Sequence, residues 1–196
     1  MPEEIEAKVK LSDPEAFRRR MAARGVAAEE TVFEVNRLFD DAAGRLRAAK
    51  SALRVREERR AADGTPLRTL LTFKGPQAPG PLKRRTEHEL TVEAAAPLVA
   101  IFEALGLGES FRYEKRRTAW RVGGCEVVLD ELPHLGWFVE VEGPTEEAVY
   151  ACLAEVGLAG EPTIRQSYVG LLADWLKEHG RDPTRAAFSE PEKQRL

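Results

Sequence analysis

The sequence has little of what marks secreted, membrane-spanning or cysteine-cluster proteins. Only two of its 196 residues are cysteine, Cys125 and Cys152, which excludes a disulfide framework and a cysteine-based metal cluster. No apolar run approaches the roughly 20 residues that span a bilayer. The start of the chain lacks the basic and apolar regions of a secretory signal. We therefore expect a soluble, reduced, cytoplasmic protein with no membrane partner.

The net charge is also small. Thirty Lys and Arg against thirty-three Asp and Glu leave a net charge of −3, so the whole molecule does not attract nucleic acid, and no nucleic-acid partner is expected. Charged residues nevertheless make up 32% of the chain, above the usual quarter. Many of these charges therefore need a place other than an ordinary solvated surface.

Period-two alternation of apolar and polar residues predicts eight strands, at residues 3–11, 30–40, 51–59, 67–74, 83–92, 111–121, 125–130 and 137–142. Helical spacing and end signals predict helices at residues 13–24, 94–105, 145–156 and 164–179. Because most strands follow one another through short connections, the sequence predicts an α+β fold. We expect an eight-stranded antiparallel β-barrel with helices packed outside it.

No linker divides the chain, so the prediction is one domain over residues 1–180. Residues 181–196 are polar, contain two prolines and are predicted to form a mobile tail.

The polar half of each strand is dominated by charged residues at every second position. These are Glu4, Glu6, Lys8 and Lys10, then Arg54 and Arg56, Lys74 beside Thr72, Arg85, Glu87 and Glu89, Lys115 and Arg117, Asp130, and finally Glu140 and Glu142. One interpretation is a solvated face with ordinary cross-strand ion pairs. However, solvated faces also use Ser, Thr, Asn and Gln freely, and the apolar stripes of the helices indicate that helices cover the apolar face. The charged face then lines the lumen of a closed barrel.

Like charges that line one lumen would repel one another unless a ligand with both anionic and cationic groups lay between them. A polyphosphate with divalent cations fits, because basic side chains neutralise phosphate oxygens and acidic ones hold the bridging metal ions.

The motifs occur in a characteristic order. They are Glu4-Ile5-Glu6-Ala7-Lys8, Leu53-Arg54-Val55-Arg56, Leu71-Thr72-Phe73-Lys74-Gly75-Pro76, Arg85-Thr86-Glu87-His88-Glu89, Lys115-Arg116-Arg117, Leu129-Asp130-Glu131, Leu135-Gly136-Trp137-Phe138-Val139-Glu140-Val141-Glu142 and Ser167-Tyr168-Val169-Gly170-Leu171-Leu172. This order resembles the CYTH superfamily, also called triphosphate tunnel metalloenzymes, over about residues 3–176. The superfamily contains class IV adenylate cyclases, thiamine triphosphatases and inorganic triphosphatases. The sequence is most similar to its class IV cyclase branch.

The resemblance implies a tunnel through the barrel and roles for its charges. Mg²⁺ or Mn²⁺ would be held by Glu4, Glu6, Glu140 and Glu142, with Glu87 and Asp130 assisting. The triphosphate would be gripped by Lys8, Arg54, Arg56, Lys74, Arg85, Lys115 and Arg117, and Arg165, near the predicted capping helix, is a further candidate. The candidate catalytic lysines are Lys8, Lys74 and Lys115, and a carboxylate stays open as the base.

The implied substrate is a small molecule with a triphosphate: ATP, thiamine triphosphate or tripolyphosphate. Attack by the ribose 3′-hydroxyl of ATP on the α-phosphorus would give cyclic AMP and pyrophosphate, and this is the leading prediction. Attack by water would make the protein a triphosphatase. A barrel that binds polyphosphate or nucleotide without turnover is the third alternative, and a homodimer stays open.

Overall fold

The strands close into the predicted barrel. The computed structural model describes residues 3–193, and side chains from Ile5 onward. The strands are β1 (Glu3–Leu11), β2 (Val32–Asp41), β3 (Ala52–Arg60), β4 (Pro66–Lys74), β5 (Lys83–Val92), β6 (Leu107–Val122), β7 (Cys125–Leu132) and β8 (Gly136–Gly143). Their order is β2-β3-β4-β5-β1-β8-β7-β6, and a β2–β6 pairing closes the ring. All eight pairings are antiparallel, which confirms the predicted fold class.

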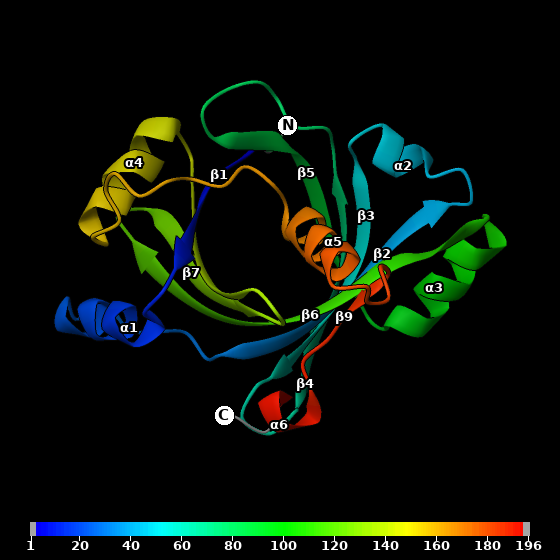
Figure 1. Cartoon of the computed structure of the whole chain (residues 1–196), viewed down its shortest axis with the longest axis horizontal. Helices are drawn as coiled ribbons and strands as arrows, with labels where there is room; N and C mark the ends of the chain where they lie inside the picture. Colours follow the sequence, from blue (N-terminus) through cyan, green and yellow to red (C-terminus); the bar gives the residue numbers. More distant parts are fainter. Residues whose placement is uncertain (1–2, 194–196) are drawn as a thin grey trace.

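Helices cover the apolar outer face of the barrel on two sides (Figure 1). On one side, α1 (Pro14–Ala23) and α4 (Glu146–Glu155) share a buried cluster with the outward residues of β1, β6, β7 and β8. On the other, α3 (Ala95–Ala104) packs Phe102 edge-on against Phe39, with 5.1 Å between ring centroids. The short α2 (Arg45–Ala48) connects β2 to β3. None of the helices in the described part of the chain combines the length and apolar character needed to cross a bilayer.

The helix predicted at 164–179 starts later than expected and lies at the end of the barrel. Helix α5 spans Tyr168–Glu178, and the Ser167 side chain accepts a hydrogen bond from the backbone N–H of Gly170. Residues 163 and 164 are extended because they bond to β1, with the Ile164 N–H donating to the Lys8 carbonyl at 2.8 Å. The Tyr168 ring packs against the inward-facing Phe138, so α5 is surrounded by strands in Figure 1.

The segment predicted to be a tail lies against the barrel up to residue 193. Strand β6 has 16 residues, and β7 pairs only with its second half, which leaves an edge of the first half free. The two-residue β9 (Arg185–Ala186) occupies this edge in parallel. Phe188 then inserts beside Phe33 and Arg116, and α6 (Glu190–Lys193) follows. Ala186 and Phe188 are buried, and the Phe188 N–H donates to Glu114 at 3.0 Å, so this segment is held in place although its average composition is polar.

Phe188 is 4% exposed, so its truncation to alanine leaves a cavity between the C-terminal segment and β6. Phe188→Ala is expected to lower the free energy of unfolding by about 3 kcal/mol. Urea denaturation followed by circular dichroism measures this. Leu67→Ala, at a strand position that is 42% exposed, is the control and should change the value by less than about 0.5 kcal/mol. Equal stability of both variants and the wild type would contradict the packed position of Phe188.

Candidate active site

The barrel encloses a cavity of about 970 Å³. Its lining contains most of the charged residues singled out from the sequence: Glu6, Lys8, Arg54, Arg56, Lys74, Arg85, Lys115, Arg117, Glu140, Glu142 and Arg165. Asp130 and Glu87 lie behind this lining, each bonded to a cation that borders the cavity. Glu4 belongs to β1 by its backbone, opposite Arg85, and its side chain lies outside the described residues.

Strand alternation places these charges inside. On β1, Ile5, Ala7 and Val9 point outward into the core shared with α1 and α4, so Glu6 and Lys8 must point into the barrel. The same parity holds on β8, where Val139 and Val141 are in the outer core and Glu140 and Glu142 border the cavity. The apolar core of this protein therefore lies outside the sheet, and the charges lie within it.

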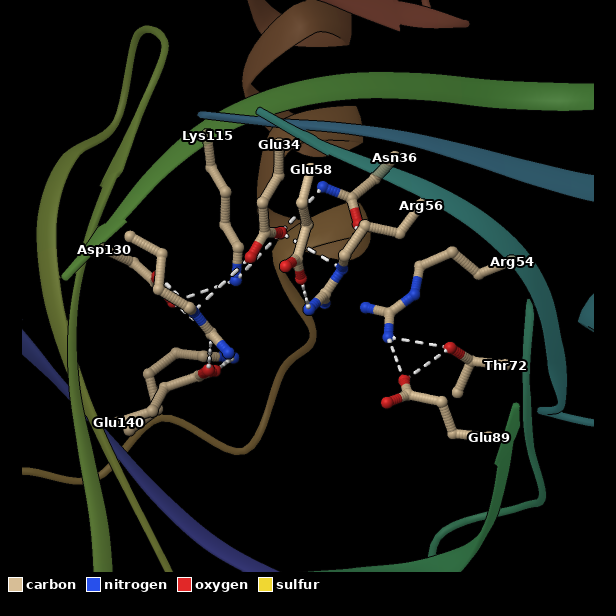
Figure 2. A network of polar contacts seen from close by, with 12 residues as sticks. Glu34, Asn36, Arg54, Arg56, Glu58, Thr72, Glu89, Lys115, Asp130 and Glu140 are labelled. Atoms are coloured by element: carbon tan, nitrogen blue, oxygen red, sulfur yellow. Dashed lines mark hydrogen bonds and ion pairs between the residues drawn. The ribbon is translucent and has the colours of Figure 1, made fainter. Parts of the chain in front are cut away.

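A buried carboxylate, Glu34 of β2, joins several of these cations into one network (Figure 2). Its Oε2 lies 3.2 Å from Arg56 Nε and 3.5 Å from Lys115 Nζ, and its Oε1 lies 3.7 Å from Arg117 Nε. Asn36 donates to Glu34 Oε2 at 3.1 Å and accepts from Arg56 Nε at 3.0 Å. Strands β2, β3 and β6 are thus connected by one polar network.

Arg117 is held by two further carboxylates. It donates from Nε and Nη2 to the two carboxylate oxygens of Asp130, at 2.8 and 2.6 Å, and from Nη2 to Glu140 at 2.9 Å. The other oxygen of Glu140 lies 3.5 Å from Lys8 Nζ, which also donates to the Gln166 carbonyl at 2.8 Å. The extended segment before α5 therefore fixes Lys8, which explains why the late start of that helix matters for the site.

Burial and neighbouring charges shift several pKa values. Burial lowers the pKa of Lys115, repulsion from Arg117 lowers it further, and Asp130 and Glu34 only partly compensate, so that it reaches about 8. Burial by itself would raise the pKa of Glu34, but Arg56, Lys115 and Arg117 hold it well below its usual range. Glu34 is consequently ionised throughout the physiological pH range, whereas Lys115 titrates near its upper end.

A second group of contacts crosses β3, β4 and β5. Arg54 donates to Thr72 at 3.1 Å and lies 3.6 Å from Glu89, and Lys74 lies 2.5 Å from Glu87. Here too each cation has an acidic or hydroxyl partner on the neighbouring strand.

Acidic side chains form a row on β1, β8 and β7. Glu6 lies directly opposite Glu142, and Glu142 lies directly opposite Glu126. Direct cross-strand neighbours have Cβ atoms about 5 Å apart, so carboxylates placed this way can share one cation. Lys83 supplies positive charge to Glu6 through an ion pair in which both side chains are buried. Hard carboxylate oxygens are the ligands that Mg²⁺ and Mn²⁺ prefer, so this donor set fits the predicted metals.

Among the side chains that the structure describes, no three acidic, histidine or cysteine residues converge into a complete metal cage.

Sequence reasoning missed Glu34, Asn36, Lys83 and Glu126. The alternation on which it relied could have found two of them, because Lys83 is in phase with Arg85, and Glu126 with Asp130. Glu34 gave a weaker signal, since its in-phase neighbours are Val32 and Asn36 and so form no charge pair along the strand.

Solved structures support the fold. A protein from Pyrococcus horikoshii OT3, PH1819, superposes with a TM-score of 0.73 at 23% identity, over 88% of this chain and 99% of its own. The adenylyl cyclase candidate HpAC1 from Hippeastrum, described as having a dominant triphosphatase activity, superposes with a TM-score of 0.65 at 21% identity, over 91% and 97%.

Sequence comparison gives the family. A relative from Methanocaldococcus jannaschii named "Putative adenylate cyclase MJ0240" is 27% identical over 177 residues, which are 86% of this chain and 97% of that protein. The family model for the CYTH domain matches residues 2–156, and these residues contribute all eight barrel strands and nearly all of the charged lining. The protein is therefore a member of the CYTH domain family.

Proposed function

We propose that the protein is a divalent-metal-dependent enzyme that binds a triphosphate in the barrel and converts ATP to cyclic AMP and pyrophosphate. The observation that carries the proposal is a cavity whose lining combines eight strand-borne cations with Glu6, Glu140 and Glu142. The eight cations are Lys8, Arg54, Arg56, Lys74, Lys83, Arg85, Lys115 and Arg117. An anion receptor needs the cations, but it has little use for inward carboxylates.

The cations would contact the phosphate oxygens. Guanidinium groups bind two phosphate oxygens at once, and Arg54 and Arg56 follow one another along the inward face of β3. Because hydrogen bonds and ion pairs already hold these side chains, little reorganisation is needed as negative charge develops on the bridging and leaving oxygens.

Glu6, Glu142 and Glu140 would hold Mg²⁺ or Mn²⁺, with Glu4 from the same inward face of β1. When bound, the metal neutralises phosphate charge and stabilises the leaving oxygen. Asp130 and Glu87 would act indirectly, because each is bonded to a cation of the lining, Arg117 and Lys74 respectively.

Three features support cyclisation of ATP. A cavity of about 970 Å³ is at the upper end of the range for small-molecule sites, so it has room for a nucleoside as well as the triphosphate. Phe111 and Thr184 are among the residues that border it, and Phe111 offers an aromatic surface for a nucleobase. The relative from Methanocaldococcus jannaschii carries the name of an adenylate cyclase. The proton of the attacking 3′-hydroxyl would pass to a lysine of low pKa or to a carboxylate.

Hydrolysis is the second candidate, and the described activity of the Hippeastrum relative favours it. The same cations would stabilise attack by water on the terminal phosphorus of ATP, thiamine triphosphate or tripolyphosphate.

Product analysis decides between these reactions. Purified protein is incubated with Mg²⁺ or Mn²⁺ and each of the three triphosphates, and cyclic AMP, pyrophosphate and phosphate are quantified. Cyclic AMP with an equal amount of pyrophosphate is the expected result with ATP. Phosphate release without cyclic AMP would replace the cyclase by a triphosphatase. Tight binding without any product would leave a binding module and overturn the enzyme proposal.

Glu6→Gln and Glu142→Gln should each lower metal-dependent turnover by at least about 100-fold, since one neutral amide replaces one metal-binding carboxylate. The fold of Glu142→Gln should persist, because repulsion from Glu6 and Glu126 on the adjacent strands is relieved, whereas Glu6→Gln also removes the buried ion pair with Lys83 and should be less stable. Steady-state rates at saturating Mn²⁺ measure the effect. Glu57→Gln, on the outward face of β3, should keep the wild-type rate. Full activity of both tunnel variants would reject the metal assignment.

The pKa of about 8 for Lys115 gives a pH prediction with a defined sign. If the protonated amine grips phosphate, kcat/KM falls as pH rises through 8, because kcat/KM reports the free enzyme. Lys115→Arg should then move the fall upward by at least one pH unit. A kcat/KM that instead rises through pH 8 in the wild type would assign Lys115 as the base, which must be neutral to accept a proton.

A further inference from the structure

Glu34 contacts three of the proposed phosphate-binding cations and yet is out of reach of a substrate. Its side chain is fully buried and is not part of the cavity lining, whereas Arg56, Lys115 and Arg117 all border the cavity. The three cations come from two strands on either side of Glu34, since β2 pairs with both β3 and β6. Glu34 therefore sits behind the cations, on the side away from the substrate.

The bonding of Glu34 is incomplete. Oε2 accepts from Asn36 and lies close to Arg56 and Lys115. Oε1 is buried, accepts no hydrogen bond and has Arg117 at 3.7 Å. A buried charge is costly unless cations compensate it, so this carboxylate is retained at a site where it serves three cations at once. Without it, Asp130, Glu140 and Glu58 would be left to balance three cations that repel one another in a poorly solvated interior.

We propose that Glu34 is a positioning residue: an internal counter-ion that aligns Arg56, Lys115 and Arg117 from behind and competes with the phosphates for their charge. This inference rests on the proposed function. Glu34 has two opposing effects. It keeps the cations in place for turnover, and it weakens the binding of triphosphate. Removing its charge should therefore tighten binding and slow the reaction together. A purely structural defect would not tighten binding.

Glu34→Gln tests this, because the amide keeps the size of the side chain and can still accept from Asn36. The Kd for tripolyphosphate is measured by calorimetry in the presence of EDTA. The kcat and KM are measured with Mg²⁺ and whichever triphosphate the wild type turns over. The Kd and KM should fall at least about 5-fold, and kcat at least about 10-fold. Glu58→Gln is the matched control: Glu58 is buried, and its ion pairs among the described residues are with Arg56 and the exposed Arg68 rather than with Lys115 or Arg117. In that variant Arg56 still has its ion pair with Glu34, so the Kd for tripolyphosphate should stay within about 2-fold of the wild-type value.

The outcomes separate the two proposals. A wild type that neither binds nor turns over any triphosphate overturns the proposed function and this inference with it. An active wild type with an unchanged or higher Kd in Glu34→Gln overturns the inference alone. If Glu34→Gln does not fold, Glu34→Asp keeps the charge and shortens the reach. Its Kd should then stay within about 2-fold while kcat falls at least about 5-fold, and an unchanged kcat would overturn the positioning role.

Discussion

Opposite charges that face one another across the inside of a closed sheet are the interaction on which this structure depends. Burying a single charge without a partner costs several kcal/mol, so an interior of this kind is possible only when each charge has a partner at short range. Arg117 with Asp130 and Glu140, and Arg56 with Glu34 and Asn36, meet this condition. Hydrophobic stabilisation comes from elsewhere, from the layer between the strands and the helices outside them.

The placement of charges inside the barrel and apolar residues outside it explains the rest of the architecture. A closed barrel has no free edges around its ring, so its strands can present polar side chains inward without losing their pairing. Strand β9 occupies part of the β6 edge that β7 leaves unpaired, at Arg112 and Tyr113. Helix α5 brings apolar residues to the inward-facing Phe138 and Tyr113, which gives one end of the lumen an apolar closure.

The same pairing prepares the site for a phosphate chain. Acidic side chains neutralise the tunnel's cations within the protein and fix their orientation. In such a site, a triphosphate with its metal would exchange one set of anionic partners for another, at little cost in side-chain ordering. The small net charge of the chain is consistent with this internal balance.

The sequence by itself determined which residues face inward. Alternation is local, and the apolar half of each strand must meet the helices, so Glu6, Lys8 and Arg54 could be assigned to the lumen from the pattern alone. Only the tertiary structure decided which charges meet. Glu34 contacts Lys115 because β2 closes the ring onto β6, and Lys8 bonds to Gln166 because an extended segment returns across β1. These contacts depend on strand register and chain closure between residues far apart in sequence, and period-two alternation carries no information about either.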